Sequence, residues 1–417
     1  MESPFCIARA KVASCHIRAA DSLSMDAREA RAAWVTPMLG RNGKLLYMGP
    51  LLKGISTVYR QFHVFTVEFG GEVSSAGFDI TCRGSIKRIH QNVTSDGVPT
   101  AIPLISPAIL TSVYRYKPDL LILTEFSALT IYGMLLSLIL KRARILLIVE
   151  NRPVKVGSAL SRKIRRQIRR WIARHVDAIL TNNIDGRSYL LEEIGVEESR
   201  IVCRPYLISD MSRYSAIHGD SDIRRKARGK NEPIRFLFVG RLIQSKGLHH
   251  ALQAFDHLKK RYPGKFLFDI VGDGPYRPLL EKQVHQFGLQ EHVFFHGQQP
   301  YDSLANLYRG VDVFLFPTLM DYRSLVCFEA MSAGLPILAS IHDGGAIEAV
   351  KEGKNGYTFD PLDHLYLAEL MSRFIEHPEQ VGKFSSQSKL MSEAYTLPHA
   401  VESVVAASNI ALAGRRH

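Results

Sequence analysis

Short, almost wholly apolar segments alternate with longer amphipathic segments through the second half of this chain, and this alternation restricts the fold more than any other feature. Strands of a parallel sheet, which are covered on both faces, are apolar at nearly every position. Segments of this kind occupy residues 235–239, 266–271, 293–296, 311–316 and 336–340. Between the first two, Leu248, Ala251, Leu252 and Phe255 follow the spacing of an amphipathic helix. Strand–helix–strand alternation predicts an α/β fold with a parallel sheet.

The first half repeats this pattern less regularly. Its predicted strands are residues 32–36, 119–124, 144–150, 176–181 and 200–204. The polar, charge-rich residues 211–233 are interpreted as a linker. We therefore expect an extension of uncertain role over 1–30, then two Rossmann-like domains over 31–210 and 234–384, with parallel sheets facing a central cleft. A C-terminal helix at about 385–417 is expected to be able to pack back on the first domain. Ligands of such sheets bind at the carboxyl ends of the strands.

Composition favours a globular, intracellular protein. Hydrophobic residues make up 46% of the 417 positions, enough for two cores. Five scattered cysteines lack metal-ligand spacing, which favours a reducing cytosol and predicts no metal site. The longest apolar stretch, residues 131–140, is about half the length needed to cross a bilayer. It is predicted to form a buried helix.

The net charge of +13 is concentrated in the first half. Residues 1–210 contain 29 Lys and Arg against 18 Asp and Glu, whereas residues 211–417 contain 24 against 22. A basic lobe attracts nucleic acid, an anionic lipid surface or a phosphate-bearing acceptor. A nucleic-acid-binding protein would show interleaved aromatic and basic residues or a known binding motif, and neither occurs.

Residues 161–175 form a predicted basic helix with seven Lys and Arg and no acid. Ile164, Ile168, Trp171 and Ile172 share one face of it. One interpretation is an ordinary amphipathic helix whose isoleucines pack inward while its basic face is solvated. The other is docking against anionic lipid, worth about 1 kcal/mol per basic residue near the surface. The two interpretations are compatible.

The end of the strand at 235–239 carries the first candidate site. Gly240 allows a ligand close to the backbone, and Arg241 and Lys246 follow in the loop. Two cations there could clamp a diphosphate, or they could merely solvate the loop.

Residues 316–336 carry the second candidate site. Ser324 is predicted to cap a helix that runs to about Ala333, and the backbone N–H groups of Ser324 and Leu325 would form an anion site. Asp321 precedes the helix, and Glu329 lies on its mostly apolar surface. Two carboxylates could each hold vicinal sugar hydroxyls. The alternative for Glu329 is a surface salt bridge.

Glycine turns follow other strands. The Gly272-Asp273-Gly274-Pro275 turn is interpreted as structural. Gly297 could pass close to a nucleotide base. The Gly344–Gly345 pair permits a tight turn before Glu348, which is predicted to lie in the next helix.

These segments together resemble glycosyltransferase family 4, whose members adopt the GT-B fold. Members carry Gly-Arg and, five residues after the arginine, a lysine, as at Gly240, Arg241 and Lys246. They also carry two acids ahead of an Ala-Met-x-x-Gly-x-Pro run, as at Asp321, Glu329 and residues 330–336. The resemblance covers about residues 234–380.

The resemblance implies a retaining transferase that moves a sugar from a nucleotide-diphosphate sugar to a glycan or lipid-linked acceptor, without a metal or other cofactor. It implies polysaccharide or glycolipid biosynthesis in the cytoplasm or on the cytosolic membrane face. Arg241 and Lys246 would bind the diphosphate, Glu329 the ribose and Asp321 the transferred sugar. The expected donor-binding residues are Gly240, Ser324, Leu325 and Gly297. The alternatives are a GT-B protein without transferase activity, such as a scaffold or an epimerase, and a nucleic-acid-binding protein.

The sequence departs from the family pattern in three places. Asp321 stands where Glu is commoner. Residues 322–324 replace the usual Gly-Phe-Gly, so Ser324 stands where a glycine lets the backbone approach the phosphate, and Arg323 either adds a charge or faces solvent. Residues 123–127 lack the histidine that many members place near the acceptor. Glu125 is the candidate base or hydroxyl partner there, and Gly40 and Gly43 are predicted to shape the acceptor entrance.

Overall fold

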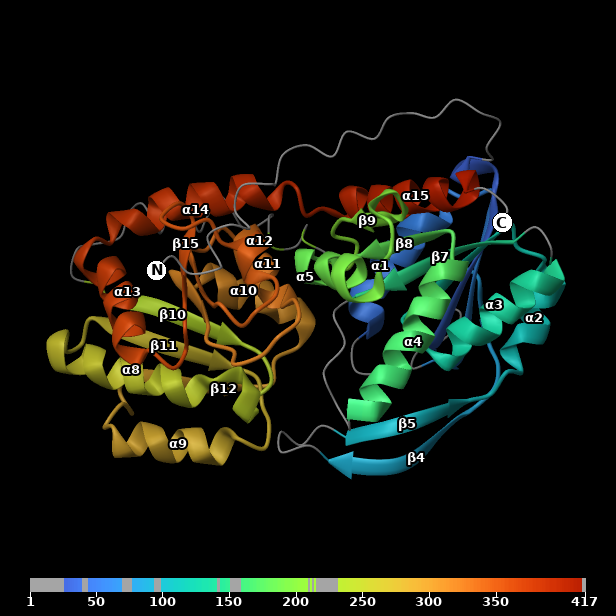
Figure 1. Cartoon of the computed structure of the whole chain (residues 1–417). Coiled ribbons are helices and arrows are strands. Elements are labelled where there is room, and N and C mark those ends of the chain that lie inside the picture. Colours follow the sequence, from blue (N-terminus) through green and yellow to red (C-terminus); the bar gives the residue numbers. More distant parts are fainter. Residues whose placement is uncertain are drawn as a thin grey trace.

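The structure, a computed structural model, describes residues 26–39, 44–69, 77–93, 99–140, 143–150, 159–208, 211, 214 and 232–414. Within these ranges the chain forms two α/β lobes, each built around its own parallel sheet (Figure 1). The predicted pair of Rossmann-like domains is therefore confirmed.

The N-terminal sheet has seven strands in the order β3-β2-β1-β6-β7-β8-β9, and every neighbouring pair is parallel. The strands are β1 (Arg31–Leu39), β2 (Gln61–Phe69), β3 (Ile80–Cys82), β6 (Leu120–Thr124), β7 (Arg144–Val149), β8 (Ala178–Thr181) and β9 (Ile201–Cys203). An antiparallel pair, β4 (Ile86–Val93) and β5 (Pro99–Ile105), extends from it. The sequence pattern does not predict β2 to β5, although β2 lies beside the central β1.

Helices cover both faces of this sheet. One face packs on α2 (Ile109–Tyr116), α3 (Ala128–Leu140), α4 (Ala159–His175) and a π-helical segment, Tyr189–Ile194. The other packs on α1 (Lys44–Ser56) and on the last helix of the chain, α15 (Leu397–Ala413). Because both faces are covered, strands such as β7 are buried along nearly their whole length.

The C-terminal sheet has six parallel strands in the order β12-β11-β10-β13-β14-β15. The strands are β10 (Ile234–Val239), β11 (Phe266–Val271), β12 (Val293–Gly297), β13 (Val313–Phe316), β14 (Ile337–Ser340) and β15 (Gly356–Phe359). The helices are α8 (Leu248–Arg261), α9 (Arg277–Gln286), α10 (Leu304–Arg309), α11 (Leu325–Ser332), α12 (Ala346–Ala349), α13 (His364–Glu376) and α14 (Glu379–Ser392).

After α14 the chain crosses back to the N-terminal domain, where α15 lies along β7, β8 and α1 (Figure 1). Two hydrogen bonds fix it there. The Asn409 side chain accepts from the backbone N–H of Ala27 at 2.9 Å, and Ser408 hydrogen-bonds the buried Tyr59 hydroxyl at 2.7 Å. The C-terminal segment therefore belongs partly to each lobe.

Two sequence expectations about the helices are partly wrong. The apolar stretch 131–140 forms the helix α3 but is only partly buried: Met134 and Leu136 are buried, whereas Leu138 and Ile139 are largely exposed. On α4, Ile172 packs inward, but Ile164, Ile168 and Trp171 are exposed. The reason is the orientation of α4, since Ile172 faces the core and the other three side chains lie on a different side of the helix. No helix within the described ranges is long and apolar enough to span a bilayer.

Lowering the pH from 6.5 to 4 is expected to destabilise the folded chain through His249. This side chain is partly buried on α8 against the rings of Tyr276 and His250. Burial, aided by the nearby charge of His250, lowers its pKa from 6.5 to about 4. Within that window the unfolded chain binds a proton that the folded chain does not, so the free energy of unfolding falls as the pH falls.

Thermal melts between pH 7 and pH 4 test this. The variant His249→Gln should flatten the dependence of Tm on pH over that window. The matched control is His377→Gln, since His377 is exposed at the end of α13. Equal pH slopes for both variants would contradict the assignment.

Candidate active site

Three loops meet at the carboxyl edge of the C-terminal sheet, after β10, β13 and β14. The Leu319 N–H donates to the carbonyl of Ser245 at 2.8 Å, joining the first loop to the second. The Gly344 N–H donates to the carbonyl of Asp321 at 3.0 Å, joining the second to the third. The candidate residues of three separate segments are thereby brought to one edge.

Glycine makes this close stacking of loops possible. A Cβ on Gly247, which has a φ of +67°, would lie 1.9 Å from the carbonyl oxygen of Pro317. A Cβ on Gly344 would lie 2.0 Å from the carbonyl oxygen of Tyr322. No other residue fits at either position without moving a backbone.

Lys246 and Asp321 form an ion pair within these loops, with Nζ 2.5 Å from Oδ2. Both side chains are mostly buried, and the ammonium also lies 5.1 Å from the centre of the Phe316 ring. The two groups predicted to bind different parts of a donor are thus direct partners in this structure. Arg241 lies in the same loop as Lys246 and is exposed.

Glu329 is buried on α11, with 1% of its surface exposed, which rules out the surface salt bridge considered for it. The hydroxyl of Tyr308 donates to its Oε2 at 3.2 Å, and that of Tyr301 to its Oε1 at 3.4 Å. Tyr214 packs edge-on against both phenol rings. Burial, followed by the charge of Glu329, raises the pKa of the Tyr308 hydroxyl well above its usual value, so it stays a donor. The two tyrosine hydroxyls are thus among the groups that hold the buried Glu329 carboxylate.

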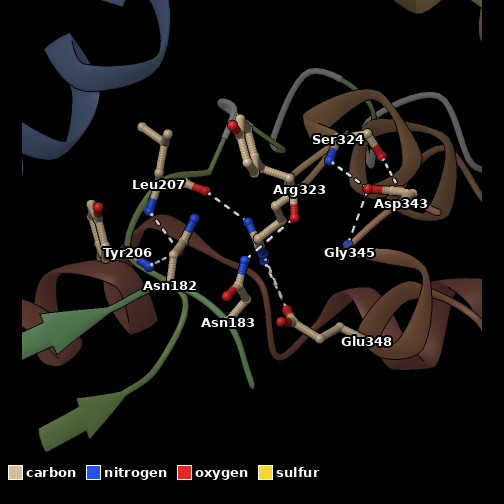
Figure 2. A network of polar contacts seen from close by, with 10 residues as sticks. Asn182, Asn183, Tyr206, Leu207, Arg323, Ser324, Asp343, Gly345 and Glu348 are labelled. Atoms are coloured by element: carbon tan, nitrogen blue, oxygen red, sulfur yellow. Dashed lines mark hydrogen bonds and ion pairs between the residues drawn. The ribbon is translucent and has the colours of Figure 1, made fainter. Parts of the chain in front are cut away.

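Ser324 occupies the N-cap position of α11, as predicted, but its side chain does not cap the helix (Figure 2). Its Oγ donates to Asp343 Oδ2 at 2.5 Å, and its backbone N–H donates to Asp343 Oδ1 at 3.0 Å. Burial is the largest of the effects that raise the pKa of the Asp343 carboxyl. The Ser324 N–H, which was predicted to bind a phosphate, is therefore already hydrogen-bonded to Asp343. The next backbone N–H, at the start of the helix, belongs to Leu325.

Arg323 is also buried, contrary to the expectation that it adds a charge or faces solvent (Figure 2). Its Nε and Nη2 each lie 3.2 Å from Glu348 Oε2, and its guanidinium lies 4.0 Å from the centre of the Phe328 ring. Its Nη1 donates at 3.1 Å to the carbonyl of Leu207, beyond β9 of the N-terminal domain. Glu348 lies in α12 as predicted. Burial raises the pKa of its carboxyl, and the charge of Arg323 opposes this effect.

A second contact joins the two domains beside Arg323. Asn183, directly after β8, donates from Nδ2 to the carbonyl of Tyr322 at 3.4 Å. The neighbouring Asn182 accepts from the backbone N–H groups of Tyr206 and Leu207 at 3.0 and 3.4 Å (Figure 2). The loop that departs from the family pattern is therefore one place where the C-terminal domain contacts the N-terminal one.

Glu125 lies at the carboxyl end of β6 with a left-handed φ of 59°. Its Oε1 accepts from the backbone N–H of Glu150, at the end of β7, at 2.9 Å. Tyr322 of the opposite domain has a raised pKa because of burial, then the charge of Asp321, then that of Glu125. Glu125 is thus at the cleft edge of its own sheet and close enough to influence the donor loop. Left-handed backbone of this kind costs about 1–3 kcal/mol and is concentrated at functional sites.

The other glycine candidates have different positions. Gly297 ends β12 with a φ of +69°, and its carbonyl accepts from the N–H of Gly272 at 2.8 Å. A Cβ on Gly272 would lie 1.9 Å from the carbonyl oxygen of Gly240, so packing alone explains that glycine and favours the structural interpretation of its turn. Gly40 and Gly43 lie outside the described residues.

Several residues of this site have no signal in the sequence. Tyr301 and Tyr308 flank Glu329 from a different segment, Asp343 binds the start of α11, and Asn183 comes from the other domain. Each is an ordinary residue type in its own segment, so only the packing of segments reveals it. No group of three or more His, Cys, Asp or Glu within the described ranges is arranged to hold a metal ion.

Known proteins resemble mainly the C-terminal domain of this chain. Residues 220–391 match the family described as glycosyl transferases group 1. An uncharacterised glycosyltransferase of Methanocaldococcus jannaschii is 33% identical over 135 residues, which are 32% of this chain and 34% of that protein. The putative colanic acid biosynthesis glycosyltransferase WcaL of Salmonella typhimurium is 28% identical over 176 residues, 40% of this chain and 41% of that protein. The chain thus spans well under two thirds of the length of these relatives.

Solved structures extend the comparison to both domains. The Alr3699/HepE protein of Anabaena, solved in complex with UDP, superimposes with a TM-score of 0.69 at 18% identity. The match covers 90% of this chain and 98% of the Anabaena chain, so the similarity in fold extends over both lobes. Residues 220–391 are therefore similar to the glycosyl transferases group 1 family, and the whole chain has the GT-B arrangement of two Rossmann-like domains.

Proposed function

We propose that this protein is a retaining glycosyltransferase that moves a sugar from a nucleotide-diphosphate sugar to a glycan or lipid-linked acceptor. The observation that carries the proposal is the convergence of Lys246, Asp321, Glu329 and the start of α11 at one sheet edge. Cations and a helix N-terminus suit a diphosphate, and carboxylates suit vicinal hydroxyls. The family similarity supports this, and it does not favour a nucleic-acid-binding protein, a scaffold or an epimerase.

Each residue has a proposed role toward the donor. Arg241 and Lys246 bind the diphosphate, which replaces Asp321 as the partner of the Lys246 ammonium. Asp321 then turns to the hydroxyls of the transferred sugar. Glu329 holds the ribose, and Tyr308 keeps its carboxylate in position. Gly240 and Gly297 leave room beside the nucleotide, and the N–H of Leu325 faces phosphate.

The proposed reaction breaks the bond between the sugar C1 and the diphosphate oxygen. The acceptor hydroxyl forms its bond to C1 on the same face, and its proton passes to the departing diphosphate, so the anomeric configuration is retained. The main catalytic contribution is stabilisation of the charge that develops on the leaving diphosphate. Arg241 and Lys246 supply it, and no metal or other cofactor is required.

The acceptor is proposed to enter from the N-terminal domain, where Glu125 is the candidate hydrogen-bond partner of its hydroxyl. The positive charge of the first half suits an acceptor at an anionic membrane surface on the cytosolic side. The proposed setting is polysaccharide or glycolipid biosynthesis. WcaL of Salmonella typhimurium, by its name, acts in colanic acid biosynthesis.

A thermal-shift screen with UDP-, GDP- and ADP-sugars tests the donor site. A ligand that binds only the folded state raises Tm, and the rise grows with its affinity and its concentration. We expect one nucleotide class to raise Tm of the native protein, Glu329→Ala to lose that shift, and Lys246→Ala to keep part of the shift while losing transfer. The transferred product, analysed by NMR, should keep the anomeric configuration of the donor, and transfer should persist in EDTA. An inverted product, or transfer that survives both substitutions, would contradict the proposal.

A further inference from the structure

The outer surface of α3 and α4 exposes an unusual amount of apolar side chain. Eighteen large hydrophobic residues are exposed across the described ranges, and seven of them lie on these two neighbouring helices. They are Leu135, Leu138, Ile139, Leu160, Ile164, Ile168 and Trp171. Leu138 is 74% exposed and Leu160 is 68% exposed, so this α3–α4 surface is solvated in the isolated protein. Contiguous exposed apolar patches mark interaction surfaces.

The four exposed residues of α4 form a continuous stripe. At 3.6 residues per turn, Leu160, Ile164, Ile168 and Trp171 fall within about 80° of arc. The opposite side holds the helix on its domain: Arg169 donates to the Tyr189 hydroxyl at 3.2 Å and Arg170 to the carbonyl of Glu193 at 3.1 Å. The apolar stripe therefore points away from the sheet.

Two basic residues border the stripe. Arg162, Lys163, Arg166 and Arg174 are exposed on α4, and the helix carries no acidic residue. By the same helical geometry, Lys163 and Arg174 lie about 40–60° from one edge of the stripe, whereas Arg162 and Arg166 lie about 160° from its centre. An apolar stripe bordered by cations is the arrangement of helices that lie in the interface of a lipid bilayer.

The stripe ends beside a cavity of about 860 Å³. Leu135 and Leu138 of α3 and Trp171 of α4 line one part of it, and the start of β7, the acids Asp177 and Glu197 and the end of α15 line the rest. Both helices lie on the same face of the N-terminal sheet (Figure 1). The exposed side chains of α3 and α4 thus make one surface.

We propose that the α3–α4 surface docks on an anionic lipid bilayer, with the apolar stripe in the headgroup region and the flanking basic residues on lipid phosphates. This inference rests on the proposed function, which supplies the lipid-linked acceptor. Docking would let that acceptor reach the cleft from the membrane. Charge complementarity selects the occupant, because the two cations beside the stripe and the absence of acidic residues on α4 favour anionic lipid over a second copy of an equally basic surface. Vesicle binding itself does not require catalysis.

Tryptophan fluorescence tests the docking directly. The chain has two tryptophans, of which Trp34 is fully buried and Trp171 lies in the stripe. With vesicles of phosphatidylcholine containing phosphatidylglycerol, we expect a blue shift of the emission and quenching by lipids brominated near the headgroup. The variant Trp171→Phe should lose both signals. Vesicles of phosphatidylcholine alone, or high salt, should weaken binding at least tenfold.

Paired variants separate the two parts of the surface. Lys163→Gln with Arg174→Gln should weaken binding to anionic vesicles about 10- to 30-fold. Ile164→Ser with Ile168→Ser should abolish the blue shift. The matched controls carry the same changes on the C-terminal domain: Lys282→Gln with Lys383→Gln, and Leu362→Ser with Leu365→Ser, all at exposed positions.

The docking proposal would be overturned if the control variants lost as much binding, or if the protein bound no vesicles, with or without binding an oligonucleotide instead. It would also be overturned by a concentration-dependent dimer in sedimentation that the Ile164 and Ile168 changes dissociate. The donor-induced thermal shift checks the fold of each variant. If that shift persists while vesicle binding is absent, the docking fails and the transferase proposal stands. If the protein binds vesicles but no donor, the transferase proposal fails and the docking proposal stands.

Discussion

Replacing Lys246 with methionine should lower kcat by ~10²–10³-fold, the usual effect of removing one preorganised group from a developing negative charge. Methionine keeps the length and much of the apolar volume of the side chain. It removes the ammonium that lies 2.5 Å from Asp321 and above the Phe316 ring. Steady-state kinetics with the donor from the thermal-shift screen measures the loss. The effect should fall on kcat more than on KM, because the leaving group is most charged in the transition state.

The control for this result is Lys282→Met. Lys282 is an exposed lysine of α9 in the same domain, and its loss removes an equal charge without touching the three loops. Its kinetics should match those of the native protein. A tenfold or smaller decrease in kcat for Lys246→Met would contradict the assigned role. A similar decrease in both variants would show that net charge, not position, is responsible.

Replacing Arg323 with methionine should lower the free energy of unfolding by about 3–5 kcal/mol, since it leaves one charge of a buried pair without its partner. The Arg323 side chain is 2% exposed and that of Glu348 is 12% exposed. Without the guanidinium, burial and the charge of Asp343 act unopposed on Glu348 and raise its pKa further. The change also removes the donor to the carbonyl of Leu207. Urea denaturation followed by circular dichroism measures the loss.

Two further variants make this prediction specific. Adding Glu348→Met to Arg323→Met should recover at least half of the lost stability, because no charge then remains buried. Arg261→Met removes an ion pair of similar length with Glu376 on the surface, and should cost at most about 1 kcal/mol. A cost for Arg323→Met no larger than for Arg261→Met, with no recovery in the double variant, would exclude the buried pair as a stabilising contact.

The two-domain fold is largely predictable from the sequence. Wholly apolar strands of the C-terminal half stand out because both of their faces are covered, and the alternation with amphipathic helices implies the parallel sheet. Strand β2 lacks that signal, since His63, Thr66 and Glu68 interrupt it, yet it pairs along its length with β1. The candidate residues of the C-terminal half follow strand ends, and the carboxyl ends of parallel strands necessarily share one edge.

What the sequence by itself determined is therefore the fold class and the placing of Lys246, Asp321 and Glu329 at that edge, because both depend on local pattern and chain direction. Only the tertiary structure decided which residues meet. Lys246 and Asp321 are 75 positions apart, and Arg323 and Leu207 are 116 apart. It likewise decided that Arg323 is buried while the apolar stripe of α4 is exposed. Burial depends on which segments cover a side chain, and neither the residue type nor its helical periodicity contains that information.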